Sequence, residues 1–256
     1  MKKHRKHWLL SIRPAFIGSA LKRLLRVKRR VVETDNGIFF IDPASNFGNG
    51  VLESGYEPEM TETLNSLLGE GDTFVDLGAN EGYFSIIASK IVGNSGKVIS
   101  IEPQSRLQSV IFRNMSENKA FNIDVFQRAI SDHIGIASLS LLPDMNTGGS
   151  GLFCATKYSV PKENVPQVTL AHLLNQTCKD KIRLLKMDIE GFEYEAIFGS
   201  ENYFINDIIE NIALELHPTL LERRGKSAEE ILHFLQKCGY VINKNFKTLV
   251  LSKKIS

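Results

Sequence analysis

Three acidic residues stand at the ends of short apolar runs that have the composition of buried strands. Asp76 ends the first run, Glu102 follows the second and Asp188 follows the third. Because the carboxyl ends of parallel strands meet at one edge of an open α/β sheet, we expect these carboxylates to lie close together. His217 follows a fourth run of the same kind. Acids and a histidine at one edge can bind a positively charged or hydroxyl-rich ligand and can move protons.

A turn with two glycines follows Asp76 directly. Gly78 and Gly82 allow a backbone with positive φ and let the chain approach a ligand closely. The helix expected after Gly82 directs its free amide groups toward the same place. The turn is one residue shorter than the GxGxxG pattern of dinucleotide-binding folds, and no Lys-Ser/Thr pair follows it as in a P-loop. A pyrophosphate is therefore disfavoured as the ligand.

The charge of this edge favours S-adenosylmethionine as the ligand. The ammonium and sulfonium groups of that cofactor are positive and its ribose carries two hydroxyls, which suits an edge with Asp76, Glu102 and Asp188. Nucleotide-binding α/β folds often place an acid at the end of the second strand, where it accepts hydrogen bonds from ribose hydroxyls. Glu102 has that position.

The elements that must position these residues alternate between strand and helix. Predicted strands cover residues 73–75, 97–101, 124–126, 182–187 and 209–216. Predicted helices begin near residue 82, span 105–119, open at 189–193 and end with 227–238. This alternation is typical of an α/β fold with a parallel sheet. Residues 240–243 and 248–251 predict an antiparallel hairpin at the end of the chain.

Two segments break this alternation. Residues 31–50 predict a β-hairpin around an Asn-Gly turn, and a short helix after it ends near Gly69. Residues 136–141 predict an extra strand, whereas the Gly-, Pro- and polar-rich residues 143–151 and 157–166 predict an inserted loop. Loops of this length within a compact domain are often lids or substrate loops.

Basic residues are concentrated at the beginning of the chain. The net charge is +2, yet residues 1–30 contain eleven Lys and Arg and no acid, while the rest of the chain contains 20 basic and 29 acidic residues. Residues 15–30 predict a helix with one apolar face. That face comprises Ile17, Leu21, Leu24 and Leu25. A basic amphipathic helix fits three partners, namely an anionic membrane surface, a nucleic acid, or the main domain, which it would cap.

We therefore expect three parts in the chain. These are a basic arm at 1–30, a hairpin and helix cap at 31–70, and the cofactor-binding domain at 71–256. The three cysteines are far apart and form no zinc-binding pattern. No apolar run approaches the about 18 residues of a membrane span. We expect a cytoplasmic protein, with the arm as the place for peripheral membrane contact.

The glycine turn resembles motif I of class I S-adenosylmethionine-dependent methyltransferases, over Val75–Ser85. More narrowly, the chain resembles the FkbM family over about residues 31–252, and the Lys-x-Asp-x-Glu-Gly-x-Glu motif at 186–193 is the most family-specific part. Three further segments carry the resemblance, namely Gly55–Glu59, Ile101–Pro103 and Glu215–Pro218. One departure is visible, because Ala171-His172 stand where the family tends to have two aspartates.

The resemblance implies a Rossmann-like class I methyltransferase fold. Its sheet would be mostly parallel and seven-stranded with a reversed last strand, in agreement with the C-terminal antiparallel hairpin, and would carry a small N-terminal helix and β-hairpin extension. The resemblance also implies methyl transfer from S-adenosylmethionine to oxygen, on sugars, polyketides or other small metabolites. Glu102 would contact the ribose of the cofactor, and Ala129 and Ile130 would lie near its adenine. The remaining cofactor-binding residues would be Asp76, Gly78, Ala79, Asn80, Gly82, Tyr83, Phe84 and Asp188.

Transfer to a hydroxyl needs a close approach of the acceptor oxygen and a group that takes its proton. The catalytic candidates are Asp188, Glu190, Glu193 and His217. We prefer His217 as the base because its unperturbed pKa lies near 6.5. The alternative is an ordinary loop histidine beside Pro218. Tyr56 and Glu57, from the family segment before the first strand, are expected to contact the substrate.

Asp188 and Glu190 are also able to hold a divalent cation through their oxygen atoms. We do not favour this reading and assign no metal ligand.

Two other functions fit parts of the chain. The basic arm fits an RNA methyltransferase, but the acidic body disfavours a long phosphate footprint, so a nucleic acid is not the expected partner. The arm also fits a non-catalytic binding module that is recruited to a membrane. The identity of the acceptor and the oligomeric state stay open.

Overall fold

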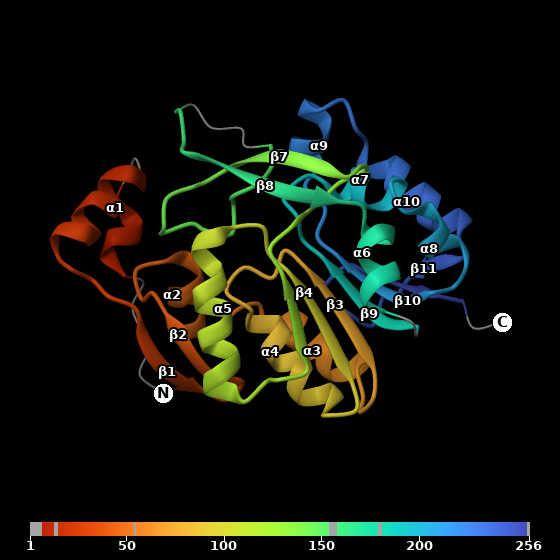
Figure 1. The fold of residues 1–256 in the computed structure, drawn as a ribbon, viewed down its shortest axis with the longest axis horizontal. Helices are drawn as coiled ribbons and strands as arrows, with labels where there is room; N and C mark the ends of the chain where they lie inside the picture. The colour runs from red at the N-terminus through yellow and green to blue at the C-terminus, as the bar shows by residue number, and fades with distance from the viewer. Residues whose placement is uncertain (1–6, 13–14, 54, 154–157, 179–180, 255–256) are drawn as a thin grey trace.

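A seven-stranded sheet forms the centre of the protein, in the order β11-β12-β10-β9-β3-β4-β5 (Figure 1). The structure is a computed structural model that describes residues 7–12, 15–53, 55–153, 158–178 and 181–254. The strands are β3 Thr73–Leu77, β4 Lys97–Ile101, β5 Ile123–Phe126, β9 Ile182–Met187, β10 Ile209–Leu214, β11 Tyr240–Ile242 and β12 Val250–Lys253.

The direction of the strands confirms the predicted topology. From β5 to β10 all neighbouring strands pair in parallel, whereas β12 runs antiparallel to both β10 and β11. The sheet is therefore mostly parallel with a reversed strand, and β11 and β12 form the predicted closing hairpin. Parallel pairing brings the ends of β3, β4 and β9 to one edge, as Asp76, Glu102 and Asp188 require.

Helices cover both faces of the sheet, because its strands have apolar side chains on both sides. In β3, Phe74 belongs to one core cluster, and Val75 and Leu77 belong to the other. The first cluster packs α2 Asn46–Glu53, α3 Pro58–Leu67 and α4 Tyr83–Val92. The second packs α6 Leu170–Thr177, α7 Glu193–Phe198, α8 Glu201–Ile205, α9 Pro218–Arg223 and α10 Ala228–Lys237. The helix α5 Ser105–Asn118 lies against α4 and the N-terminal hairpin (Figure 1).

The helix α6 keeps an N-terminal cap in spite of the departure at Ala171-His172. The hydroxyl oxygen of Thr169 accepts a hydrogen bond from the His172 amide. This cap satisfies one of the free amide groups at the start of the helix.

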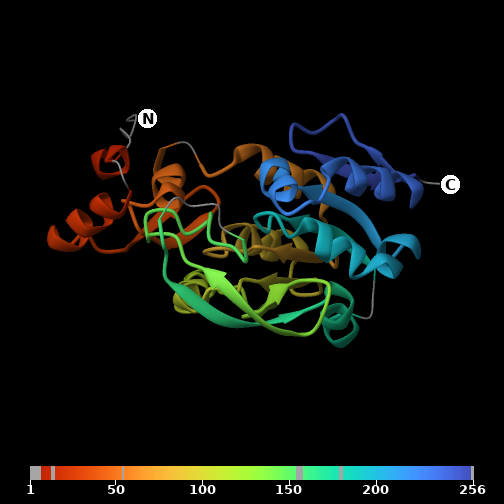
Figure 2. The same cartoon turned by 90° about the horizontal axis from the view of Figure 1, so that it is seen from above.

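A second, three-stranded sheet lies beside the main one (Figures 1 and 2). It consists of β6 Ala129–Ile130, β7 Gly135–Ser140 and β8 Lys162–Val168, with β8 in the middle. β7 confirms the predicted extra strand. The loop predicted over 157–166 is wrong from Lys162 onward, because this segment pairs with β7. Residue 157 lies outside the described residues.

The strand β8 could not be predicted from the sequence, because its residues are largely polar and include Pro166. β6 pairs with β8 only at Gln167 and Val168, so β8 has a free edge at Pro166. A proline is tolerated at such an edge, where the missing amide hydrogen breaks no ladder.

The N-terminal region contains η1 Trp8–Ser11, α1 Ala15–Leu24 and the hairpin of β1 Arg30–Thr34 and β2 Gly37–Ile41. The hairpin confirms the prediction over residues 31–41, but the hairpin predicted to extend to residue 50 is wrong from Asn46 onward, where α2 begins. The helix predicted over 15–30 is wrong beyond Leu24, because Arg26 has a left-handed φ of 54° and Arg30 already enters β1. Residues 1–6 and 13–14 of the predicted arm lie outside the described residues. None of the helices in the described ranges combines the length and the apolar character that crossing a bilayer requires.

Candidate active site

A cavity of about 410 Å³ opens at the carboxyl edge of β3, β4 and β9. Twelve of the residues singled out in the sequence line it, namely Tyr56, Glu57, Gly78, Ala79, Asn80, Tyr83, Phe84, Glu102, Ala129, Ile130, Asp188 and Glu190. The other predicted site residues, Asp76, Gly82, Glu193 and His217, are not part of this lining. The structure therefore brings residues from six separate segments to one place, as the alternation of strand and helix predicted.

The turn after β3 is shaped by a close backbone contact. Gly78 has a φ of 81°, and a side chain there would place its Cβ 1.8 Å from the carbonyl oxygen of Asp188. Only glycine fits where two strand ends approach so closely. Asn80 and Gly82 also have positive φ, at 49° and 81°. We call residues Gly78–Gly82 the cofactor turn.

Glu102 holds the cofactor turn in place through a hydrogen bond to its backbone. Its Oε2 accepts a hydrogen bond from the amide of Asn80 at 2.8 Å, and its Oε1 accepts from the amide and the side chain of Gln104 at 2.9 and 3.0 Å. Glu102 is almost fully buried, and burial raises the pKa of its carboxyl to about 7. A carboxylate with free lone pairs at the floor of the cavity can still accept from hydroxyls.

A second carboxylate of the turn is held by the N-terminal arm. Glu81 is fully buried, and its carboxylate accepts hydrogen bonds from the two terminal nitrogens of the Arg29 guanidinium, at 2.7 and 2.8 Å. The side chain of Asn114 on α5 donates to the carbonyl oxygen of Glu81 at 2.9 Å. Two-point arginine–carboxylate pairs are the strong and directional kind. Arg29 thus belongs to the framework of the cofactor turn and not to a solvated basic tail.

Asp76 forms a buried pair with Lys186, which lines the cavity. Asp76 accepts a hydrogen bond from the Ser85 hydroxyl at 2.6 Å, and its other oxygen lies 3.6 Å from the Lys186 ammonium. The same ammonium lies 3.6 Å from Asp188. Burial opposes the charge of Lys186, but the carboxylates of Asp188, Asp76 and Glu57 outweigh it and raise the pKa of the ammonium. The Lys186 ammonium therefore lies between two carboxylates, Asp76 beside the cofactor turn and Asp188 at the opposite end of the site.

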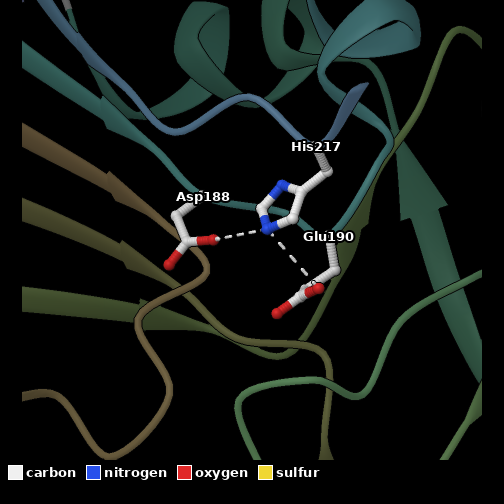
Figure 3. A group of neighbouring side chains, drawn as sticks. All are labelled: Asp188, Glu190 and His217. Carbon is white, nitrogen blue, oxygen red and sulfur yellow. Dashed lines mark ion pairs between the residues drawn. The ribbon is translucent and has the colours of Figure 1, made fainter. Parts of the chain in front are cut away.

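At that other end, Asp188, Glu190 and His217 face one another (Figure 3). We call these three residues the acceptor edge. The Nε2 atom of His217 lies 3.9 Å from Asp188 Oδ1 and 3.5 Å from Glu190 Oε2. Asp188 follows β9 and His217 follows β10, so parallel pairing of these strands brings the side chains together.

Glu193 orients the histidine of the acceptor edge. Its Oε1 lies 2.9 Å from His217 Nδ1 and also accepts a hydrogen bond from the backbone amide of Gly191 at 3.0 Å. Glu193 is fully buried at the start of α7. Burial opposes a charged imidazole, but Glu193, Glu190 and Asp188 outweigh it and raise the pKa of His217 to about 9. Burial raises the pKa of Glu190 to about 7, helped by the neighbouring acids.

The acceptor edge also offers atoms to a cation. One atom each from Asp188, Glu190 and His217 lies within 4.8 Å of the others, which is compatible with binding of a divalent metal ion. The imidazolium of His217 already supplies a positive charge to both carboxylates at 3.5 and 3.9 Å. The arrangement is therefore complete as an ion-pair network.

An aromatic wall and an inserted loop complete the cavity. The ring of Tyr56 lies 5.9 Å from those of both Tyr83 and Phe84, between centroids. From the loop after β7, the Thr147 hydroxyl donates to the side-chain oxygen of Asn80 at 3.0 Å. The carbonyl oxygen of Thr147 accepts from Gln104 at 3.1 Å. The loop predicted at 143–151 is thus attached to the cofactor turn and lines the cavity.

Comparison with known proteins agrees with this geometry. The family model described as the Methyltransferase FkbM domain matches residues 76–242. The chain belongs to the FkbM methyltransferase family. The protein is an S-adenosylmethionine-dependent methyltransferase with a Rossmann-like fold, as its sheet order and its resemblance predicted. No curated protein matches the chain.

Several solved structures share the course of the chain. A proposed rRNA methylase from Clostridium thermocellum has 12% identity and a TM-score of 0.48, over 78% of this chain and 95% of that one. The methyltransferase FkbM from Methylobacillus flagellatus has 15% identity and a TM-score of 0.45, over 75% of this chain and 50% of that one. Fibrillarin from Aeropyrum pernix, with bound S-adenosyl-L-methionine, has 12% identity and a TM-score of 0.38, over 75% and 72%.

The residues of this FkbM methyltransferase fit S-adenosylmethionine. The cavity has the volume of an ordinary small-molecule site. Its wall provides the carboxylate of Glu102 for hydroxyls and the acids Glu57 and Asp188 for positive groups. Ala129 and Ile130 of β6 supply an apolar surface. The positive groups of the cofactor would thus be close to the carboxylates of Glu57 and Asp188.

Sequence reasoning missed several residues of the FkbM methyltransferase site. Gln104, Arg128, Phe192 and Glu215 line the cavity, and so does the loop segment Gly148–Leu152. Gln104 directly follows Ile101–Pro103, and Glu215 begins Glu215–Pro218, both segments that the sequence singled out, so the position of these two residues could have been predicted. The pairing of Arg29 with Glu81 could not be predicted, because Arg29 lies 52 residues away in a segment with the pattern of a solvated charge run.

Proposed function

We propose that the enzyme transfers the methyl group to a hydroxyl oxygen of a small molecule or glycan, and that His217 takes the hydroxyl proton. The hydrogen bond from His217 Nδ1 to the buried Glu193 supports this role, because it turns Nε2 toward Asp188 and Glu190 on the cavity wall. A base oriented by a buried carboxylate is the usual arrangement for activating a weak nucleophile.

The bound cofactor supplies a methyl group that is activated by the positive sulfur. With the cofactor held in the cavity, the acceptor oxygen would receive its methyl group in place of the sulfur, and Nε2 of His217 would take the hydroxyl proton. Asp188 and Glu190 line the cavity next to Nε2, so they accept hydrogen bonds from the acceptor and orient it. Such positioning is the main contribution to a displacement that needs a close, aligned approach.

The protonation of His217 couples the base to cofactor binding. With a pKa of about 9, the imidazole carries a proton at neutral pH in the free protein. A second positive charge in the neighbouring cavity disfavours the imidazolium and lowers its pKa. Cofactor binding therefore shifts His217 toward the neutral form, which is the form that accepts a proton.

The acceptor is expected beside Tyr56 and Glu57, at the end of the cavity that Asp188 and Glu190 share. Tyr56 offers an aromatic face against which a sugar or ring can pack. The acids Glu57, Asp188, Glu190 and Glu215 disfavour a phosphate backbone in this place. This wall supports a small acceptor over an RNA.

Transfer of a labelled methyl group tests the proposal. The protein is incubated with methyl-labelled S-adenosylmethionine and fractions of a cell extract, and the labelled product is analysed by mass spectrometry and NMR. We expect a methyl ether on a small molecule or glycan. Label found only in RNA, or only on nitrogen, would contradict the proposal.

A further inference from the structure

Helix α1 carries large apolar side chains on its outer face. Phe16 is 55% exposed, Ile17 40% and Leu24 76%, and Leu25 just beyond the helix is 53% exposed. We call these four residues the α1 stripe. Phe16 and Leu24 are eight residues apart, two turns of the helix, and so lie on one side of it. The helix projects at one end of the molecule in both views (Figures 1 and 2).

The inner side of α1 accounts for the attachment of the helix to the protein. Gly18, Ser19 and Lys22 are buried there, and the ammonium of Lys22 pairs with the buried carboxylate of Asp42. The ring of Phe16 meets that of Tyr158 edge-on at 6.1 Å between centroids, and none of the four stripe residues belongs to a core cluster of the described residues. Contiguous exposed apolar side chains of this size mark a place of interaction.

Basic side chains accompany the stripe. The side chain of Arg23 is 77% exposed, and Arg26 and Lys28 are exposed as well. Arg30, at the start of β1, is exposed too, whereas Lys22 pairs with Asp42 and Arg29 with Glu81 inside the protein. No acid occurs in residues 1–30, so the charge of this segment is uniformly positive.

We propose that the α1 stripe docks on the surface of an anionic lipid bilayer. A helix with an apolar face and basic flanks lies in the interface of such a membrane, where acyl chains receive the apolar side chains and headgroups receive the charges. RNA would use the basic groups but offers no place for Leu24 and Leu25. A second copy of this chain would offer acidic groups but would also need a matching apolar patch.

Docking would act next to the cavity. Gly18 of α1 packs so closely on Met145 that an added Cβ would lie 3.1 Å from its sulfur. Arg23 lies 3.7 Å from Asp144, in the same loop. This loop continues through Asn146 and Gly148, which line the cavity. The bilayer would therefore lie beside the loop that covers the active site, which suits an acceptor held at a membrane.

Vesicle flotation with the full chain tests the proposal. We expect at least tenfold more protein on vesicles of phosphatidylglycerol than on vesicles of phosphatidylcholine. The double variant Leu24→Asp/Leu25→Asp should lose at least tenfold of this binding. Both side chains are exposed, so the variant should fold, and its circular dichroism and S-adenosylmethionine affinity should match those of the parent protein.

Two further variants separate the contributions. Phe121→Asp changes a side chain that is 81% exposed elsewhere on the protein, and its vesicle binding should be unchanged. Arg23→Gln/Lys28→Gln should weaken binding to phosphatidylglycerol and reduce its dependence on salt. Parent protein that stays off phosphatidylglycerol vesicles would overturn the proposal. So would a Leu24→Asp/Leu25→Asp variant that binds vesicles normally but loses RNA retention or self-association.

Discussion

The cofactor turn and the acceptor edge lie at the same edge of one sheet, yet their charges are satisfied in different ways. In and below the turn, each carboxylate has its own donors: Glu81 has Arg29, and Glu102 has Asn80 and Gln104. At the acceptor edge, by contrast, Asp188 and Glu190 share one side of the His217 ring, and Glu57 and Glu215 stand nearby on the cavity wall.

This difference indicates two tasks. A network of matched donors and acceptors is rigid and can hold one ligand in one orientation. Burial and the neighbouring acids raise the pKa of Glu190, so its protonation responds when a positive ligand or an acceptor hydroxyl arrives. We therefore propose that the turn serves binding of the cofactor and that the edge serves proton transfer and the acceptor.

The largest effect is expected from the acceptor edge itself. His217→Gln should lower kcat for methyl transfer about 10²- to 10⁴-fold, the usual contribution of a positioned base. Glu193→Gln should lower kcat less, because the ring keeps a partner at Nδ1. The affinity for S-adenosylmethionine should not fall in either variant, and loss of the imidazolium in His217→Gln should raise it. His133→Gln, in a side chain that is 67% exposed, is the matched control. An unchanged kcat in His217→Gln would show that the edge contains another base.

The next effect concerns the framework of the turn. Arg29→Ala leaves the buried Glu81 without its partner, which should lower the free energy of unfolding by about 2–4 kcal/mol. The affinity for S-adenosylmethionine should fall as well, since Glu81 lies in the turn. Arg23→Ala, which removes an exposed pair with Asp144, should cost less than about 1 kcal/mol. Chemical denaturation of both variants measures the difference, and equal stabilities would mean that Arg29 is not part of the framework.

A third, smaller effect is the pH dependence of cofactor binding. The pKa of Glu102 is raised by burial to about 7, so its carboxyl gains a proton as the pH falls below 7. The hydrogen bonds of Asn80 and Gln104 and the charges of Asp76 and Arg106 act on the same group. Because the cofactor favours the ionised form, its affinity should drop about tenfold between pH 8 and pH 6. Calorimetry at several pH values measures this. Glu102→Gln should bind more weakly at pH 8 and show no such drop, whereas a drop that persists would point to another group.

The smallest effect is expected from chelators. Asp188, Glu190 and His217 could hold a divalent cation, but the imidazolium already occupies the position between the carboxylates. Treatment with EDTA should change kcat by less than about twofold. Loss of activity that Mg²⁺ or Mn²⁺ restores would assign the edge to a metal instead.

The sequence predicted the elements whose residues repeat a simple pattern. β3, β4 and β9 are short runs buried on both faces. An acid lies at the expected edge of each, within β3 and directly after β4 and β9. Their parallel order then determines that Asp188 lies near the cofactor turn. The closing hairpin of β11 and β12 follows from the same kind of local pattern.

Other features depend on long-range pairing that leaves no local trace. β8 is polar and contains Pro166, so only its partner β7 makes it a strand. The helix α1 ends early because Arg29 must reach Glu81 in a different part of the chain. The apolar positions of the arm were visible in the sequence, but the sequence could not show that Lys22 is buried and Leu24 exposed.

Binding of S-adenosylmethionine to Glu102→Ala tests the central claim most directly, because this residue links the cavity floor to the cofactor turn. Titration calorimetry on the parent protein should show one site per chain. Glu102→Ala should weaken that binding at least tenfold, with a folded protein confirmed by circular dichroism. Equal affinity in the two proteins would contradict the assignment of the cavity to the cofactor.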